Sequence, residues 1–133
     1  MEAFSVEADI PGGSSAAWRA RQLMRRELAG RVPRLILADV ALLLTELVAN
    51  SVRHGGAGDG TELHVRFESA PPALHVEVEN PDHVPGRVHL RPPDLVGGGG
   101  FGLHIVERLA SRWGIRDKPR TTVWFELDCE RRY

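Results

Sequence analysis

The amino-acid sequence predicts an α+β fold, in which three helices pack on one face of a mainly antiparallel mixed sheet to form a two-layer sandwich. Residues 63–67 and 74–78 alternate apolar and polar side chains around a proline-containing turn, a pattern typical of a β-hairpin. Three other segments carry apolar residues at helical spacing. Strands and helices do not alternate regularly, as they would in a doubly wound parallel fold, so we expect the helices to share one face.

The first half of the chain is predicted to hold one strand and two helices. Residues 4–10 alternate as a half-buried strand does, and a Pro-Gly-Gly turn ends that strand. A helix then extends from a serine cap at 14 or 15 to about 29, and a longer one covers about 35–54. We expect the first helix to have an apolar inner face and an arginine-rich outer face, formed respectively by Trp18, Leu23, Met24 and Leu28 and by Arg19, Arg25 and Arg26.

The second half is predicted to contain the hairpin, a long loop, a third helix and a final strand. Residues 81–100 hold four prolines and five glycines without a sustained period, and a loop of this length is usually functional, often as a lid. The third helix is expected at about 102–113 and the last strand at about 121–128. His64 and His75 fall on the polar faces of the hairpin strands, where we expect surface residues.

The composition predicts one globular domain, residues 1–133. A formal net charge of −1 gives no whole-domain electrostatic attraction to nucleic acid or to an anionic membrane. We found neither an uninterrupted apolar run of about 18 residues nor a basic-then-apolar leader. The single cysteine, Cys129, excludes an internal disulfide and a cysteine-based zinc site, and is typical of a reducing cytoplasm, the localisation we expect.

A polar stripe lies along the second helix. Glu46, Asn50, Arg53 and His54 fall within about 100° of arc on a helical projection, opposite an apolar side. Such a stripe is most often only the solvated face of an amphipathic helix. Two details favour a function: asparagine is a poor interior helix former, and the stripe leads into a glycine loop (55–60) that phosphates could approach closely.

A second glycine cluster, Gly97–Gly102, opens directly into the third helix. Backbone amides exposed at the start of a helix, with no Cβ in the way, form a natural anion site. A flexible linker would have the same composition, so the run alone leaves both interpretations open. It is neither a Walker loop nor a Rossmann fingerprint, because no Lys-Ser/Thr follows it and no strand leads immediately into it.

Together these segments resemble a known family. Residues 45–55 (TELVANSVRHG) resemble the N box of the Bergerat-fold ATPases, which include histidine kinases, gyrase and heat-shock chaperones. Residues 100–114 resemble the second glycine box, and residues 122–127 the closing strand. The length is similar to that of the single-domain anti-sigma factors with serine kinase activity, and the resemblance covers essentially the whole chain.

The resemblance implies ATP and Mg²⁺ as cofactors and a role for each matched residue. Glu46 matches the general base that accepts the proton of a target hydroxyl, and Asn50 matches the magnesium ligand. The remaining matches would bind the nucleotide: Arg53 and His54 at the phosphate end of the N box, Gly100, Gly102 and Leu103 in the glycine box, and Thr122 in support of adenine recognition.

One box departs from the family's pattern. The family places an Asp-x-Gly-x-Gly motif after the strand 74–78, whereas this chain has Asn80, Pro81 and Asp82 there and lacks both glycines. An asparagine carbonyl can still accept from the adenine amino group, but without charge assistance, which predicts an affinity about tenfold lower at most. Asp82 could stand in for the missing acid, and an ordinary turn after a strand is the alternative interpretation.

The resemblance implies an ATP-binding, anti-sigma-type serine/threonine kinase that phosphorylates an anti-sigma antagonist and binds a sigma factor in alternation. The alternative is a catalytically weak or inactive scaffold that sequesters one of these partners without phosphoryl transfer. We expect no direct nucleic-acid or membrane partner. Members of this family often dimerise, so a homodimer is a further expectation.

Overall fold

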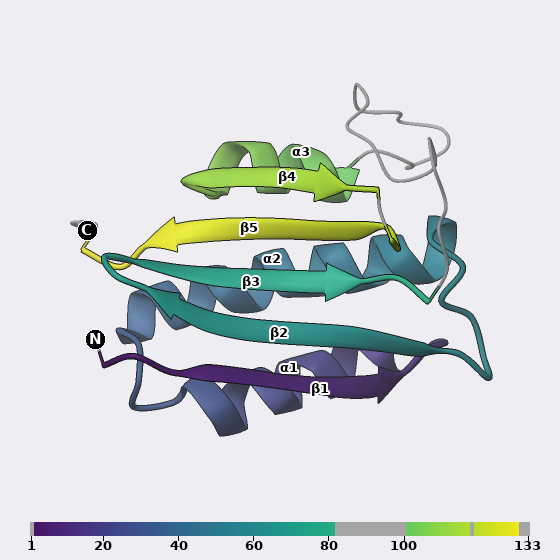
Figure 1. Ribbon diagram of the computed structural model, residues 1–133, viewed down its shortest axis with the longest axis horizontal. Coiled ribbons are helices and arrows are strands. Elements are labelled where there is room, and N and C mark those ends of the chain that lie inside the picture. Colours follow the sequence, from purple (N-terminus) through teal and green to yellow (C-terminus); the bar gives the residue numbers. More distant parts are fainter. Residues whose placement is uncertain (1, 82–100, 118, 131–133) are drawn as a thin grey trace.

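The computed structural model describes residues 2–81, 101–117 and 119–130, and it has the predicted α+β architecture (Figure 1). The described strands form one five-stranded sheet in the order β1-β2-β3-β5-β4, and each neighbouring pair is antiparallel. Their bounds are β1 Ser5–Pro11, β2 Glu62–Ala70, β3 Ala73–Glu79, β4 Arg112–Arg116 and β5 Thr122–Asp128.

Three described helices cover one face of this sheet: α1 (Ala16–Leu28), α2 (Arg34–His54) and α3 (Phe101–Leu109) (Figure 1). Helix α2 packs against both α1 and α3. Alternate residues of the strands point toward the helices and form the core with the inner faces of α1 and α2, as the period-2 pattern predicts. The buried strand residues include Leu63, Val65, Phe67, Leu74, Val76, Val78, Val123, Phe125 and Leu127.

The segment after α3 differs from the prediction. The third helix was expected to continue to about residue 113, but it ends at Leu109, and β4 follows as the edge strand beside β5. Gly114 allows β4 to pack closely on β5, since a Cβ there would lie 2.8 Å from the ring of Trp124. The indole of Trp113 donates a hydrogen bond back to Glu107 of α3. These are tertiary contacts, and helical periodicity carries no information about them.

Trp18 is a second difference. It was predicted to face the core from α1, but 55% of it is exposed. The buried stripe of α1 is centred on Ala16, Ala20 and Leu23. Trp18 lies about 160° around the helix from Ala20, so the regular helix turns it outward. The other predicted inner residues of this helix, Leu23, Met24 and Leu28, are buried.

Helix α2 is unusually apolar for the helix of a two-layer domain. By length and composition alone it could cross a membrane, with a mean hydropathy of 1.8 over its most apolar stretch. In the folded domain 44% of that stretch is buried, as is common for a core helix. Part of the remaining apolarity comes from Leu35 and Leu42, which are 55% and 44% exposed.

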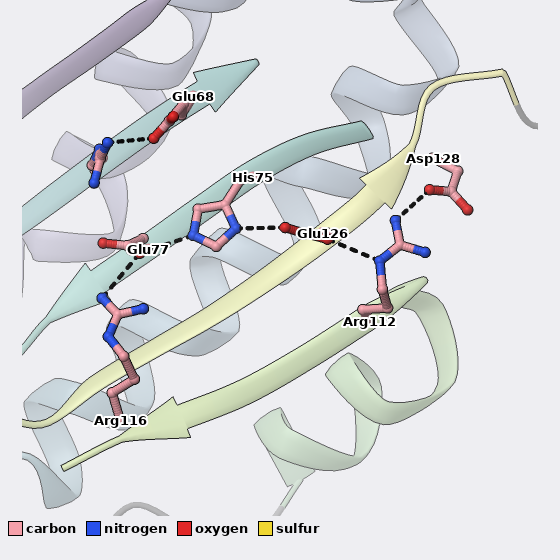
Figure 2. A network of polar contacts seen from close by, with 8 residues as sticks. Glu68, His75, Glu77, Arg112, Arg116, Glu126 and Asp128 are labelled. Carbon is pink, nitrogen blue, oxygen red and sulfur yellow. Dashed lines mark hydrogen bonds and ion pairs between the residues drawn. The ribbon is translucent and has the colours of Figure 1, made fainter. Parts of the chain in front are cut away.

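The face of the sheet away from the helices carries a network of charged side chains (Figure 2). His75 on β3 lies between two carboxylates, with its Nε2 2.8 Å from Glu77 and its Nδ1 2.9 Å from Glu126 of β5. Its ring also stacks on Trp124, with the ring centroids 5.4 Å apart. His75 is therefore half-buried within a network, rather than the simple surface residue that its strand pattern predicted.

Two arginines of β4 connect that edge strand to the same network. Arg112 donates to Glu126 and to Asp128, and Arg116 donates to Glu77 of β3 across β5 (Figure 2). The hydrogen bond from Arg112 is the main reason why the pKa of Glu126 lies below its ordinary value. Partial burial alone would raise the pKa of Glu77, but the hydrogen bonds from His75 and Arg116 outweigh it and lower that pKa.

These lowered pKa values predict a loss of stability in acid. A carboxyl group whose pKa is lower in the folded state stabilises the protein above its unfolded pKa, here 4.5, and that contribution is lost as the pH falls through the folded value. We expect Arg112→Gln to shrink the decrease in unfolding free energy between about pH 5 and about pH 3, measured by urea denaturation. Arg25→Gln, which removes an exposed arginine of α1, is the control. If the unfolding free energy fell equally with pH in both variants, Arg112 would not be the cause of the lowered pKa of Glu126.

Candidate functional site

Helix α2 directs its polar residues toward two different sides. The guanidinium of Arg21 on α1 donates to Thr45 at 3.3 Å, so the Thr45 flank of α2 faces α1. Asn50 lies about 140° around the helix from Thr45 and therefore points away from α1. Asn50 is buried, with 6% exposed, whereas Glu46, one turn earlier, is half-exposed. A carboxylate open to solvent thus stands one turn from a buried amide.

The other two residues of the predicted stripe lie in different surroundings. His54 ends α2 and is half-buried. Arg53 is exposed and lines a shallow pocket of about 150 Å³ beside Gly13 and Ser14, at the start of α1. Arg53 therefore lies near the C-terminal end of the predicted stripe, but the pocket that it lines is on the α1 side of α2.

Asn80 follows β3 and is fully buried. Its backbone N–H and its side-chain Nδ2 both donate to the carbonyl oxygen of Thr121, at 2.8 and 3.0 Å. Its side-chain oxygen Oδ1 is also buried and has no hydrogen-bond partner among the described residues. Thr122, the next residue of β5, is 3% exposed and is paired with Glu79 in the sheet register. Asn80 and Thr122 are thus brought close together at the ends of β3 and β5.

The end of α2 reaches this same position through Gly55. Gly55 caps the helix, and its N–H donates to the carbonyl of Ser51 at 2.8 Å. A Cβ at Gly55 would lie 2.3 Å from Oδ1 of Asn80 and 2.9 Å from its Cγ. Only glycine allows the helix end to approach Asn80 this closely. At Gly55 the end of α2 therefore packs directly against Asn80, the residue that departs from the family's pattern.

The glycine loop after α2 is held in place by the turn between β1 and α1. Gly13 donates from its backbone N–H to the carbonyl of Ala57 and Gly12 donates to that of Thr61, both at 2.8 Å. A side chain on Gly12 would clash with the Ala57 carbonyl, at 2.5 Å from its Cβ. The sequence shows both glycine-containing turns, one before α1 and one after α2. It does not show that the two turns contact each other, because the contacting residues are more than 40 positions apart.

The remaining predicted site residues have less structural description. Asp82 and Gly100 lie outside the described residues, as does most of the predicted lid, 81–100. Gly102 and Leu103 are in the first turn of α3, and only their backbone is described. Their place at the beginning of the helix agrees with the predicted position of the second glycine box.

Comparison with known families connects this geometry to a class of protein. A family model described as the histidine kinase-like ATPase domain matches residues 15–127. The chain belongs to the histidine kinase-like ATPase family. The match extends from the start of α1 to the end of β5, so it includes α2, Asn80 and Thr122. A comparison with curated proteins found no match.

Membership of this family supports ATP binding, and Asn80 offers one buried acceptor atom among the described residues. A buried carbonyl oxygen without a partner can accept a hydrogen bond from an N–H donor such as the exocyclic amino group of adenine. Because Nδ2 of Asn80 is engaged by Thr121, the oxygen is the atom left for such a donor. An ionised aspartate has no proton to donate to the Thr121 carbonyl, so this arrangement suits the asparagine that the chain has.

Proposed function

We propose that this histidine kinase-like ATPase domain is a serine/threonine kinase of the anti-sigma type. The observation that carries the proposal is the position of half-exposed Glu46 one helical turn before buried Asn50 on α2. A half-exposed carboxylate can receive a proton from a hydroxyl outside the protein, while a buried amide one turn away can hold a cation at the nucleotide. Both groups are on a helix whose end contacts Asn80.

Each residue then has one task in phosphoryl transfer. Bound Mg²⁺ would neutralise charge on the phosphates of ATP, and Asn50 would be its protein ligand. Asn80 would accept from the adenine amino group, with Thr122 beside it. Glu46 would orient the acceptor hydroxyl and take its proton, which it can do because it is open to solvent on the outer side of α2.

The proposed acceptor is a serine or threonine of an anti-sigma antagonist, and the second partner is a sigma factor. These finer assignments rest on the resemblance of the N box. The alternative, a scaffold that sequesters a partner without phosphoryl transfer, is favoured by one observation. Asn80 is neutral, so its hydrogen bond to adenine would lack the charge assistance of an aspartate.

Asn50→Ala tests the nucleotide site. We expect the affinity for ATP in the presence of Mg²⁺ to fall by about tenfold or more, because the cation loses its protein ligand, and to change little when Mg²⁺ is chelated. Titration calorimetry measures both affinities. Gln22→Ala is the matched control, since it removes an exposed amide from α1. Equal heats for Asn50→Ala and the wild type, or no heat for either, would overturn the proposal.

A further inference from the structure

An apolar stripe is exposed on the outer face of α2. Leu35 and Leu42 are 55% and 44% exposed, and Ala38, which lies between them, is also exposed. The segment from Leu35 to Thr45 contains a single charged residue, Asp39. Large exposed hydrophobic residues aligned on one helix are unusual in a domain that already has a complete core on the other face of that helix.

The stripe leads to Glu46. On a helical projection Leu35, Ala38, Leu42 and Glu46 fall within about 80° of arc, so they share one face. Leu42 and Glu46 are four residues apart, which corresponds to about one turn and a rise of about 6 Å. A protein segment lying on the stripe would therefore extend directly to the carboxylate that the proposed function assigns as the base.

The border of the stripe on the α1 side is basic. Arg21 is linked to Thr45, and the two helices pack as antiparallel neighbours, because residues at the start of α1 and the end of α2 line one pocket. Arg25 lies one turn beyond Arg21, about level with Leu42, and it is exposed. Arg34, also exposed, begins α2. A partner that covered the leucines would meet these guanidinium groups, which favour acidic side chains.

We propose that this stripe, defined by Leu35, Ala38 and Leu42, is the docking surface for the protein that supplies the acceptor hydroxyl. The partner would place apolar side chains on the two leucines and acidic side chains beside Arg25 and Arg34. The assignment of an acceptor protein rests on the proposed kinase function, because Glu46 determines the end of the stripe that the hydroxyl must reach. A bilayer is disfavoured because the carboxylate of Asp39 interrupts the apolar segment.

The test uses the purified anti-sigma antagonist from the genome that encodes this chain. We expect Leu42→Glu to weaken antagonist binding in calorimetry, and to raise its KM in phosphoryl transfer, by about tenfold or more. The kcat and the affinity for ATP should not change. Arg25→Glu should also weaken binding and reduce its dependence on salt. Gln22→Glu is the matched control for Leu42→Glu, because it adds the same single negative charge on the side of α1 that faces β1.

The outcomes separate this inference from the proposed function. If the wild type binds the antagonist without transferring phosphate, the kinase proposal fails, and loss of binding in Leu42→Glu still supports the docking surface. Unchanged antagonist binding in both Leu42→Glu and Arg25→Glu would overturn the docking surface. The docking surface would also be overturned if the stripe served another partner while antagonist binding persisted in Leu42→Glu. The wild type would then sediment with phosphatidylglycerol–phosphatidylcholine vesicles, or form a dimer in light scattering, and Leu42→Glu would abolish that behaviour.

Discussion

Replacement of Glu46 by glutamine is expected to reduce phosphoryl transfer to the antagonist by about 10²–10⁴-fold while ATP binding is retained. Glutamine has nearly the same size and can still accept a hydrogen bond, but it cannot take the proton of the acceptor hydroxyl. Glu46 is half-exposed at the outer side of α2, so the substitution should not disturb the core. Single-turnover transfer of labelled phosphate measures the rate, and calorimetry measures the affinity for ATP.

Glu62→Gln is the control for the loss of one negative charge. Glu62 is exposed at the start of β2, where it pairs with Pro11 of β1 in the sheet register. We expect this variant to transfer phosphate at the wild-type rate. If Glu46→Gln also retained the wild-type rate, Glu46 would not be the base, and a kinase mechanism would require another group.

Replacement of Gly55 by alanine is expected to lower the unfolding free energy by about 1–3 kcal/mol, the usual range for overpacking a buried site. The new methyl group would lie 2.3 Å from Oδ1 of Asn80, which is fully buried and cannot swing into solvent. Displacement of Asn80 would also strain its hydrogen bond to the Thr121 carbonyl. Urea denaturation measures the stability. Calorimetry should show weaker ATP binding, because the proposed adenine contact moves.

Gly58→Ala provides a matched control in the same loop. A Cβ at Gly58 meets no atom within 4 Å, so we expect the change in unfolding free energy to stay within about 0.5 kcal/mol. Equal stability and equal ATP affinity for both alanine variants would show that the contact between Gly55 and Asn80 has no energetic consequence. The proposed position of adenine would then lose its main structural support.

The Glu46→Gln variant and the wild type together distinguish the kinase from the scaffold. A kinase loses phosphoryl transfer in Glu46→Gln and retains partner binding, because only the proton acceptor is removed. A scaffold shows no transfer in the wild type, and its partner binding is unaffected by Glu46→Gln. In either case the exposed stripe of α2 remains available to a partner, since its leucines lie on the outer face of the helix.

Local sequence patterns predicted most of the secondary structure. The alternation in β2, β3 and β5 and the helical period of α1 and α2 depend on residues only two to four positions apart, so those elements were found within a few residues of their observed bounds. The pattern failed for β4, whose five residues follow α3 closely and whose backbone pairs with β5. It also failed for Trp18, because bulk and apolarity do not determine which side of a helix faces the core.

The sequence by itself determined the fold class, the polar stripe of α2 and the substitution of asparagine at position 80. Only the tertiary structure decided how these parts meet. The amide of Asn80 is oriented by the carbonyl of Thr121, 41 residues away, and its oxygen lies against Gly55, 25 residues earlier on another element. Such contacts arise when the sheet and α2 pack around one core. Periodicity describes a single element and contains no information about the residue that will lie across from it.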